Sequence, residues 1–306
     1  MGTVLGDVRY AVRALARSPG FTAVAVLTLA LGIGANTTMF SLMNAVLLRP
    51  LPFPVAERLV TVWKGRISSP TQLNIVSLPN YRDWKERSRV FDDLALLDSA
   101  GRGYNLTGGS EPEQVSGVRV TASFFTVLGV RPLLGRTFLP EEEDPGRDRV
   151  VVLSYGLWNR RYGAEPSLVG KTIPIDGQDR TVVGVMPPQF QFQAWGGPRE
   201  LWVPAGWTKG DREGIGNSFI AIGRLAPGVG LERARAEMDA IGRALAHEKP
   251  QDNEGWTVRV VPMNEYGVRD MRQGLSALQA TVGFVLLIAC VNVANLMLAR
   301  AASRHR

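Results

Sequence analysis

The chain has 306 residues, a mean hydropathy near zero and a formal net charge of +7. This length has room for about two domains, or for one domain with membrane segments. Much of the excess positive charge lies beside two uncharged segments near the ends of the chain, which favours a membrane protein over a nucleic-acid-binding one. The single cysteine excludes an internal disulfide, and the two histidines are too far apart in the sequence to indicate a histidine-based metal site.

Segment 1–20 is basic and has the spacing of an amphipathic helix. Arg9, Arg13 and Arg17 recur every four residues, so they share one helical face, with apolar residues between them at helical spacing. We predict a short helix that lies on the cytoplasmic membrane surface. A simpler interpretation, that these arginines only mark the topology, is compatible with this one.

The first candidate membrane span is segment 21–48, which contains no charged side chain. About 20 apolar residues suffice to cross the roughly 30 Å of hydrocarbon in a bilayer. The apolar core of a cleaved signal peptide is shorter, about 7–15 residues, and is followed by a small-residue cleavage site. Because no such site is evident here, the segment predicts a retained anchor.

The second candidate span is segment 275–299, which is also free of charged side chains. It is followed at once by Arg300, Arg304 and Arg306. Basic residues next to short membrane-flanking segments stay on the cytoplasmic side. We therefore expect both termini in the cytoplasm and residues 49–274 outside it, in the periplasm.

Some polar and small residues interrupt the two spans. Amides in lipid need a hydrogen-bond partner, and glycines allow helices to approach closely, so such residues are typical of helix packing. We assign this role to Gly32, Gly34, Asn36, Asn44, Asn292 and Asn295. A role in substrate passage is the less favoured alternative.

The middle of the chain alternates short strand-like and helix-like pieces, which indicates a mixed α and β domain. Its last part has the clearest pattern. "NSFIAIGRL" predicts a strand, "LERARAEMDAIGRALAHE" an amphipathic helix and "GWTVRVVPM" the next strand. A strand–helix–strand unit of this size fits a ferredoxin-like or porter-like half-domain.

Residues 121–215 are richer in proline, glycine and tryptophan. Asp176-Gly177 between two β-branched runs predicts a hairpin. The charged run 141–149 reads as a solvated loop, with Glu141–Glu143 as hydrated surface. We predict two lobes, an α/β lobe built from both ends of the domain and a β-rich lobe inserted in it.

No catalytic, cofactor-binding or metal-binding residues are predicted. Gly170-Lys171-Thr172 resembles the end of a phosphate-binding loop, but Glu165 stands where that motif needs glycine, and a strand-like run follows. Neither the nucleophile motif of hydrolases nor a zinc-protease motif occurs in the sequence.

Several phrases resemble one known family. "LLIACVNVANLMLARAASRHR" resembles the start of an FtsX-like permease domain, and the segment through the first span resembles MacB-type permeases, most of all the acidobacterial duplicated orphan permeases. "VTASFFTVLGVRPLLGRTF", "VVVLSYGLWNRRYG" and "TVVGVMPPQF" are similar to the MacB periplasmic core domain.

The resemblance implies an α+β fold in which two transmembrane helices flank a two-lobed periplasmic domain. The implied segments are a cytoplasmic amphipathic helix (1–20), transmembrane helix 1 (21–48), the periplasmic core domain (49–274), transmembrane helix 2 (275–299) and the start of a coupling segment (300–306). Within the core, the implied lobes are a porter-like one (57–120 and 216–265) and an inserted sabre-like one (121–215).

The resemblance also implies a function. Such a permease sits in the inner membrane and transmits the motion of a separate cytoplasmic ABC ATPase to its periplasmic domain, for efflux or envelope export. The implied partners are membrane lipid, that ATPase, a second permease half in a dimer or pseudo-dimer, and a periplasmic protein, with no cofactor and no nucleic acid. Family members continue past the second span, so the chain is expected to be a shortened or partial permease.

A second interpretation stays open at this point. Two spans around a periplasmic domain are also typical of a membrane sensor, or of a regulator of periplasmic partners that transports nothing. A sensor would continue beyond Arg306 into a signalling helix, whereas a permease would continue into further spans. The motifs do not identify a cargo.

Overall fold

The computed structural model describes Gly6, Arg13 and residues 19–43, 52–108, 111–192, 197–213 and 219–303. The chain divides into two compact units. One consists of residues 1–49 and 268–306, and the other of residues 50–267.

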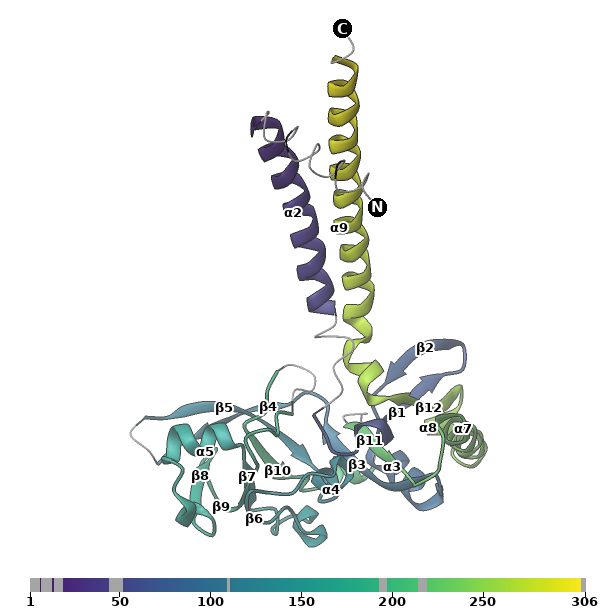
Figure 1. The fold of residues 1–306 in the computed structure, drawn as a ribbon. Helices are drawn as coiled ribbons and strands as arrows, with labels where there is room; N and C mark the ends of the chain where they lie inside the picture. Colours follow the sequence, from purple (N-terminus) through teal and green to yellow (C-terminus); the bar gives the residue numbers. More distant parts are fainter. Residues whose placement is uncertain are drawn as a thin grey trace. The chain divides into compact units, whose positions relative to one another are not determined.

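Two long helices form most of the described part of the first unit (Figure 1). They are α2 (Pro19–Met43) and α9 (Met263–Ser303), of which α9 begins in the second unit. Stretches of both helices, Thr22–Ser41 and Gly274–Asn295, are long and apolar enough to cross a membrane. Their large apolar side chains are mostly exposed in the single chain, Leu31 by 73%, so these helices suit lipid as their solvent.

The second unit is built on one sheet of twelve strands. The strands are β1 (Leu59–Arg66), β2 (Ser69–Asn74), β3 (Phe91–Asp98), β4 (Arg102–Leu106), β5 (Glu113–Val120), β6 (Leu134–Gly135), β7 (Val150–Leu153), β8 (Thr172–Ile175), β9 (Gln178–Val185), β10 (Leu201–Pro204), β11 (Phe219–Leu225) and β12 (Trp256–Pro262). Its α-helices are α3 (Leu78–Arg87), α4 (Phe124–Leu128), α5 (Tyr155–Tyr162), α6 (Lys209–Glu213), α7 (Leu231–Glu248) and α8 (Pro250–Asn253). Short 3₁₀ turns occur at η2 (Ala56–Arg58), η3 (Pro140–Glu143) and η4 (Pro166–Leu168).

One half of the sheet has the ferredoxin-like arrangement. Its strands are ordered β12-β1-β11-β3, and all neighbours are antiparallel. In chain order this half reads β1-α3-β3 and then β11-α7-β12, which is the split βαβ pattern. The predicted strand–helix–strand unit at the end of the domain is therefore confirmed, and α7 covers the predicted segment in full.

Both faces of this half are buried, which explains why β1 is apolar on both sides. Val60 and Val62 pack on a core that includes residues of α3 and α7, whereas Leu59 and Trp63 pack on the opposite core, which holds α4. Strands covered on both faces read as continuous apolar runs. Gly242 allows α7 to approach the sheet, because a Cβ there would lie 2.9 Å from the main-chain nitrogen of Val258.

The other half closes into a six-stranded barrel. Around the ring the order is β5-β10-β7-β9-β8-β4, and β4 pairs again with β5. Its interior is filled by side chains such as Leu106, Val151 and Leu201. This half is β-rich, as the sequence predicts, and it includes β4 and β5, which precede residue 121.

A tight turn joins β8 to β9 at the predicted position. Asp176 and Gly177 have φ angles of +50° and +72°, the left-handed values that a two-residue hairpin turn of this type needs. The hairpin prediction is confirmed. Thr172 begins β8, which agrees with the rejection of a phosphate-binding loop at this place.

The prediction that Glu141–Glu143 form a hydrated surface is wrong for two of them. Glu142 is 6% exposed, and its carboxylate accepts hydrogen bonds from the Arg136 guanidinium at 2.6 and 2.9 Å and from the main chain of Leu139. Glu143 accepts from Ala122 N at 2.7 Å and from Trp207 Nε1 at 2.9 Å. The partners of Glu143 lie far away in the sequence, whereas Glu142 bonds to residues three and six positions before it.

Candidate functional site

The two candidate membrane helices pack on each other through a small and a polar residue of α2 (Figure 1). A Cβ at Gly32 would lie 2.8 Å from Leu286 Cδ1 of α9. Asn36 Nδ2 donates to the Val282 carbonyl at 3.1 Å, and Gln279 Nε2 donates to Asn36 Oδ1 at 3.3 Å. An amide that bonds to the facing helix in this way can hold two helices together in lipid.

The other residues assigned to helix packing have no described contact between α2 and α9. Gly34 has nothing within 4 Å of where its Cβ would be. Asn292 and Asn295 are exposed on α9 in the single chain. Asn44 lies outside the described residues.

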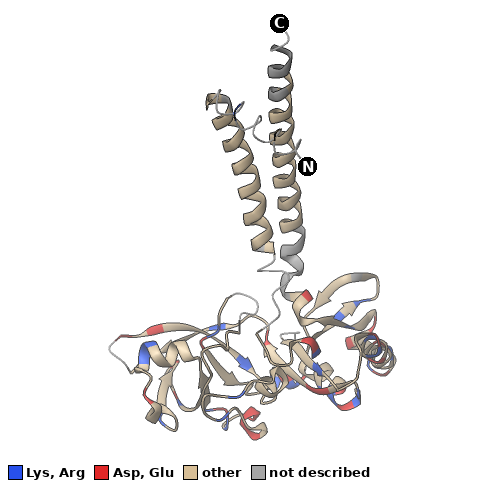
Figure 2. Cartoon of the chain, in the orientation of Figure 1, with Lys and Arg blue, Asp and Glu red and all other residues tan. Residues whose placement is uncertain are grey.

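The arginines that flank the spans are described only in part. Arg13 is helical and exposed. Arg300 belongs to the helical backbone of α9, and Arg9, Arg17, Arg304 and Arg306 lie outside the described residues. Figure 2 shows α2 without Lys, Arg, Asp or Glu. The described charged residues lie mostly in the second unit, residues 50–267, which we call the folded unit.

Replacing Gly32 by leucine is expected to push the two helices apart, because the new side chain would overlap Leu286. The change would appear as a longer and broader distance distribution between spin labels at Thr37→Cys and Thr281→Cys, in a Cys290→Ala background. Gly34→Leu is the matched control and should leave the distance unchanged, since space is open there. Equal effects of the two leucines would contradict this packing.

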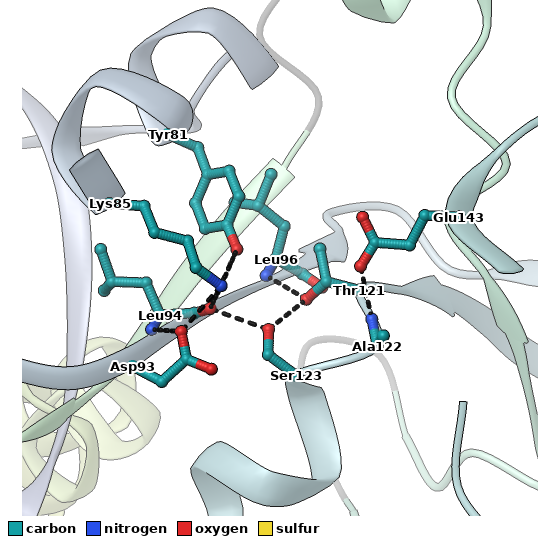
Figure 3. A network of polar contacts seen from close by, with 9 residues as sticks. All are labelled: Tyr81, Lys85, Asp93, Leu94, Leu96, Thr121, Ala122, Ser123 and Glu143. Atoms are coloured by element: carbon teal, nitrogen blue, oxygen red, sulfur yellow. Dashed lines mark hydrogen bonds and ion pairs between the residues drawn. The ribbon is translucent and has the colours of Figure 1, made fainter. Parts of the chain in front are cut away.

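Asp, Glu, His and Cys do not form a metal-binding group of three or more within the described residues. What the folded unit does contain is a buried polar network around the Leu94 carbonyl (Figure 3). That oxygen accepts hydrogen bonds from Tyr81 Oη at 2.9 Å, Lys85 Nζ at 3.3 Å and Ser123 Oγ at 2.8 Å. Through this main-chain carbonyl the network ties α3 to β3 and to the start of α4.

The titration of this network fits a structural role. Burial raises the pKa of the Tyr81 hydroxyl, so this group stays protonated and donates. Burial acts to lower the pKa of Lys85, but Tyr81 and Asp93 outweigh it and the net change is upward. Lys85 is therefore a permanent cation that pairs with Asp93 at 2.7 Å.

A cleft of about 250 Å³ opens at one end of the barrel. Its lining includes the side chains of Arg102 on β4, Arg119 on β5 and Arg180 on β9, together with Tyr104. Burial raises the pKa of the Tyr104 hydroxyl, while the nearby arginines act in the opposite direction. These residues form a polar concave site of the folded unit.

One of these arginines is held by two acidic residues. Arg119 Nε bonds to Asp98 Oδ2 at 3.2 Å, and its Nη1 bonds to Asp211 Oδ2 at 3.3 Å. Burial acts to raise the pKa of Asp211, but hydrogen bonds from Thr208 and the Arg119 guanidinium bring it below its ordinary value. Arg119 thus joins β5 of the barrel to β3 of the ferredoxin-like half.

The sequence interpretation does not single out these three arginines. A signal exists, because each has the inward parity of its strand: Arg102 precedes Tyr104 and Leu106, Arg119 follows Val115, and Arg180 precedes Val182. The signal has meaning only once the strands are known to close into a ring.

Comparison with known proteins identifies a family for most of the chain. The family model described as MacB-like periplasmic core domain matches residues 22–241. No curated protein matches the chain.

Two solved structures are similar to part of the chain. The periplasmic region of MacB from Actinobacillus actinomycetemcomitans shares 13% identity, with 72% of this chain and 94% of that one covered and a TM-score of 0.48. The extracellular domain of the noncanonic ABC-type transporter YknZ from Gram-positive bacteria shares 14% identity, with 66% and 99% covered and a TM-score of 0.46. The conclusion on the family rests on the match of the family model.

Proposed function

The chain belongs to the MacB/FtsX-like permeases with a MacB-like periplasmic core domain, and we propose that it is the membrane subunit of an ABC-type system that carries ATPase-driven motion to an extracytoplasmic domain. The work done would be efflux or envelope export. ATP would be hydrolysed by a separate cytoplasmic subunit. A second permease half and a periplasmic protein are further proposed partners.

The observation that carries the proposal is the extent of the family match. It begins within α2, the first candidate membrane helix, and ends within α7 of the folded unit. The family pattern therefore includes a membrane attachment together with the core domain. The chain adds a second attachment, since β12 ends at Pro262 and the helix that contains the second candidate span begins at Met263.

The proposed layout follows from the same family. Both termini would face the cytoplasm, with residues 49–274 outside it in the periplasm. We propose that the ferredoxin-like half, from β1 to β3 and from β11 to β12, is the porter-like lobe, and that the barrel is the sabre-like lobe. The barrel includes β4 and β5, so the boundary expected at 120/121 moves to before Arg102. The flanking arginines would mark the cytoplasmic side, and the asparagines and glycines of the spans would pack helices.

The coupling to an ATPase is tested by reconstitution. The full-length protein would be co-purified with each cytoplasmic ABC ATPase of its source organism, and ATP turnover would be measured with and without it in lipid nanodiscs. We expect one ATPase to co-purify and to be stimulated. If none co-purifies and none is stimulated, the proposed transport has no energy source, and the sensor or regulator interpretation is favoured instead.

The membrane orientation has a separate test, in which the single native cysteine is removed and new cysteines are introduced one at a time. In a Cys290→Ala background, Asp179→Cys and Arg306→Cys would be exposed to a membrane-impermeant maleimide on spheroplasts. Asp179 is exposed on the folded unit, so labelling is expected there without permeabilisation. Arg306→Cys should label only after permeabilisation. The opposite pattern would reject the orientation.

A further inference from the structure

The two ends of the barrel differ in what covers them. At one end α5 covers the opening and places Leu157 and Trp158 in the barrel core. Arg160 fixes this helix with ion pairs to Glu113 at 2.5 Å and to Glu200 at 2.7 Å. The other end contains the cleft of about 250 Å³, where Asp211 of α6 pairs with Arg119 of the lining.

The open end is lined by polar side chains from around the ring. Alternation along a strand places every second residue inside the barrel. On β4 this series runs from Leu106 and Tyr104 in the core to Arg102 at the opening, and on β9 it runs from Val182 to Arg180. Mouths of β-barrels are places where ligand sites recur.

Two of the charged residues at this opening are already paired with acidic residues. Arg119 is held by Asp98 and Asp211, and Arg102 lies 3.4 Å from the same Asp98. These two arginines therefore have acidic partners of their own.

Three charged residues that line the opening have no ion pair within the described residues. Asp176 is exposed and its Oδ1 accepts hydrogen bonds from Asn105. This leaves Arg180 and Asp148, two residues of opposite charge. Arg180 Nη1 donates to the main-chain carbonyl of Asp148 at 2.6 Å, and within the described residues no carboxylate lies within 4.0 Å of Arg180. The Asp148 carboxylate accepts from Gly146 N at 3.0 Å and has no ion pair within the same residues. Both residues line the cleft and are half-buried.

We propose that the barrel mouth binds a small zwitterion, namely a free amino acid. The ligand carboxylate would bond to the Arg180 guanidinium and to the Tyr104 hydroxyl, and its ammonium group would face Asp148. The cleft volume of about 250 Å³ suits a ligand as small as an amino acid, since sites for drug-sized ligands usually measure about 300–1,000 Å³. A polyanion would be repelled by Asp148 and by Asp176 at the rim, and a simple cation would leave the Arg180 guanidinium without an acidic partner.

The test is saturation-transfer NMR on the full chain in detergent micelles. The probes are glycine, L-alanine, L-leucine and L-glutamine, with acetate and methylamine as ligands that carry only one of the two charges. We expect at least one amino acid to bind, and to bind more tightly than either single-charge probe. Arg180→Gln is expected to weaken its binding about tenfold or more, because a charge-assisted pair of bonds is lost.

Two more variants complete the test. Asp148→Asn should weaken binding of the amino acid and leave acetate unchanged, which a misfolded barrel would not do. Arg131→Gln removes the same charge at an exposed position outside the cleft and should have no effect.

Three results would overturn the site: no amino acid binds, acetate binds as tightly as the best amino acid, or Arg180→Gln and Arg131→Gln behave alike. The result does not depend on an ATPase, so this proposal and the permease proposal can fail separately.

Discussion

Replacing Trp202 by alanine is expected to destabilise the folded unit by about 3–5 kcal/mol, the usual loss for a large aromatic side chain in a core. Trp202 is 0% exposed on β10. Its ring lies 5.7 Å from that of Phe125 and 5.3 Å from that of Phe190, measured between centroids. Alanine would leave a cavity among rings that belong to α4 and to the chain after β9, so these elements would lose their common contact.

Trp202→Phe is the matched control for this change. It keeps an aromatic ring and removes an indole nitrogen that is buried without a hydrogen-bond partner. We expect it to cost less than Trp202→Ala, because the smaller ring leaves a smaller cavity than alanine does. Urea unfolding of the protein in detergent, followed by far-UV circular dichroism, measures both variants. Equal losses would mean that the ring packing does not determine stability here.

Replacing Arg119 by leucine is the second change with a large expected effect, a loss of about 3 kcal/mol, because removing one partner of a buried ion pair leaves the other uncompensated. The Arg119 side chain is 14% exposed, and its replacement would remove the positive charge that pairs with both Asp98 and Asp211. It also lies over the Phe219 ring of β11, with 5.6 Å between the guanidinium carbon and the ring centroid. The barrel and the ferredoxin-like half would thus lose a shared anchor.

Arg102→Leu supplies the comparison, because it removes another arginine from the same Asp98. Arg102 is 58% exposed and its nitrogen lies 3.4 Å from the Asp98 oxygen. Exposed ion pairs contribute about 0–1 kcal/mol, so this variant should unfold nearly as the native protein does. Thermal unfolding of the two variants side by side decides the matter. A larger loss for Arg102→Leu would show that burial does not set the strength of these pairs.

The parts of the fold that local patterns define are predictable from the sequence. The helix 231–248 follows from apolar residues at helical spacing, and the β8–β9 hairpin follows from an Asp-Gly pair between β-branched runs. The two candidate membrane helices follow from length and the lack of charge. Each of these signals lies within a few turns or residues of the chain.

The parts that depend on distant pairing are not predictable in this way. The barrel closes through the parallel pairing of β10 with β5, in which Leu201 faces Gly117. Nothing near either residue specifies the other, because a parallel pair needs a long connection. The polar cleft at the barrel mouth depends on this closure, so it escaped the sequence interpretation.

The order of the strands along the chain has a consequence for how the protein is made. All six barrel strands lie between Arg102 and Pro204, whereas the ferredoxin-like half joins β1 and β3 to β11 and β12 across that whole stretch. A polypeptide emerging from the ribosome or the translocon therefore holds a complete set of barrel strands first. Until the last third of the chain, with β11 and β12, has been made, β1 and β3 each keep an unpaired strand edge. A chaperone would be needed during that interval.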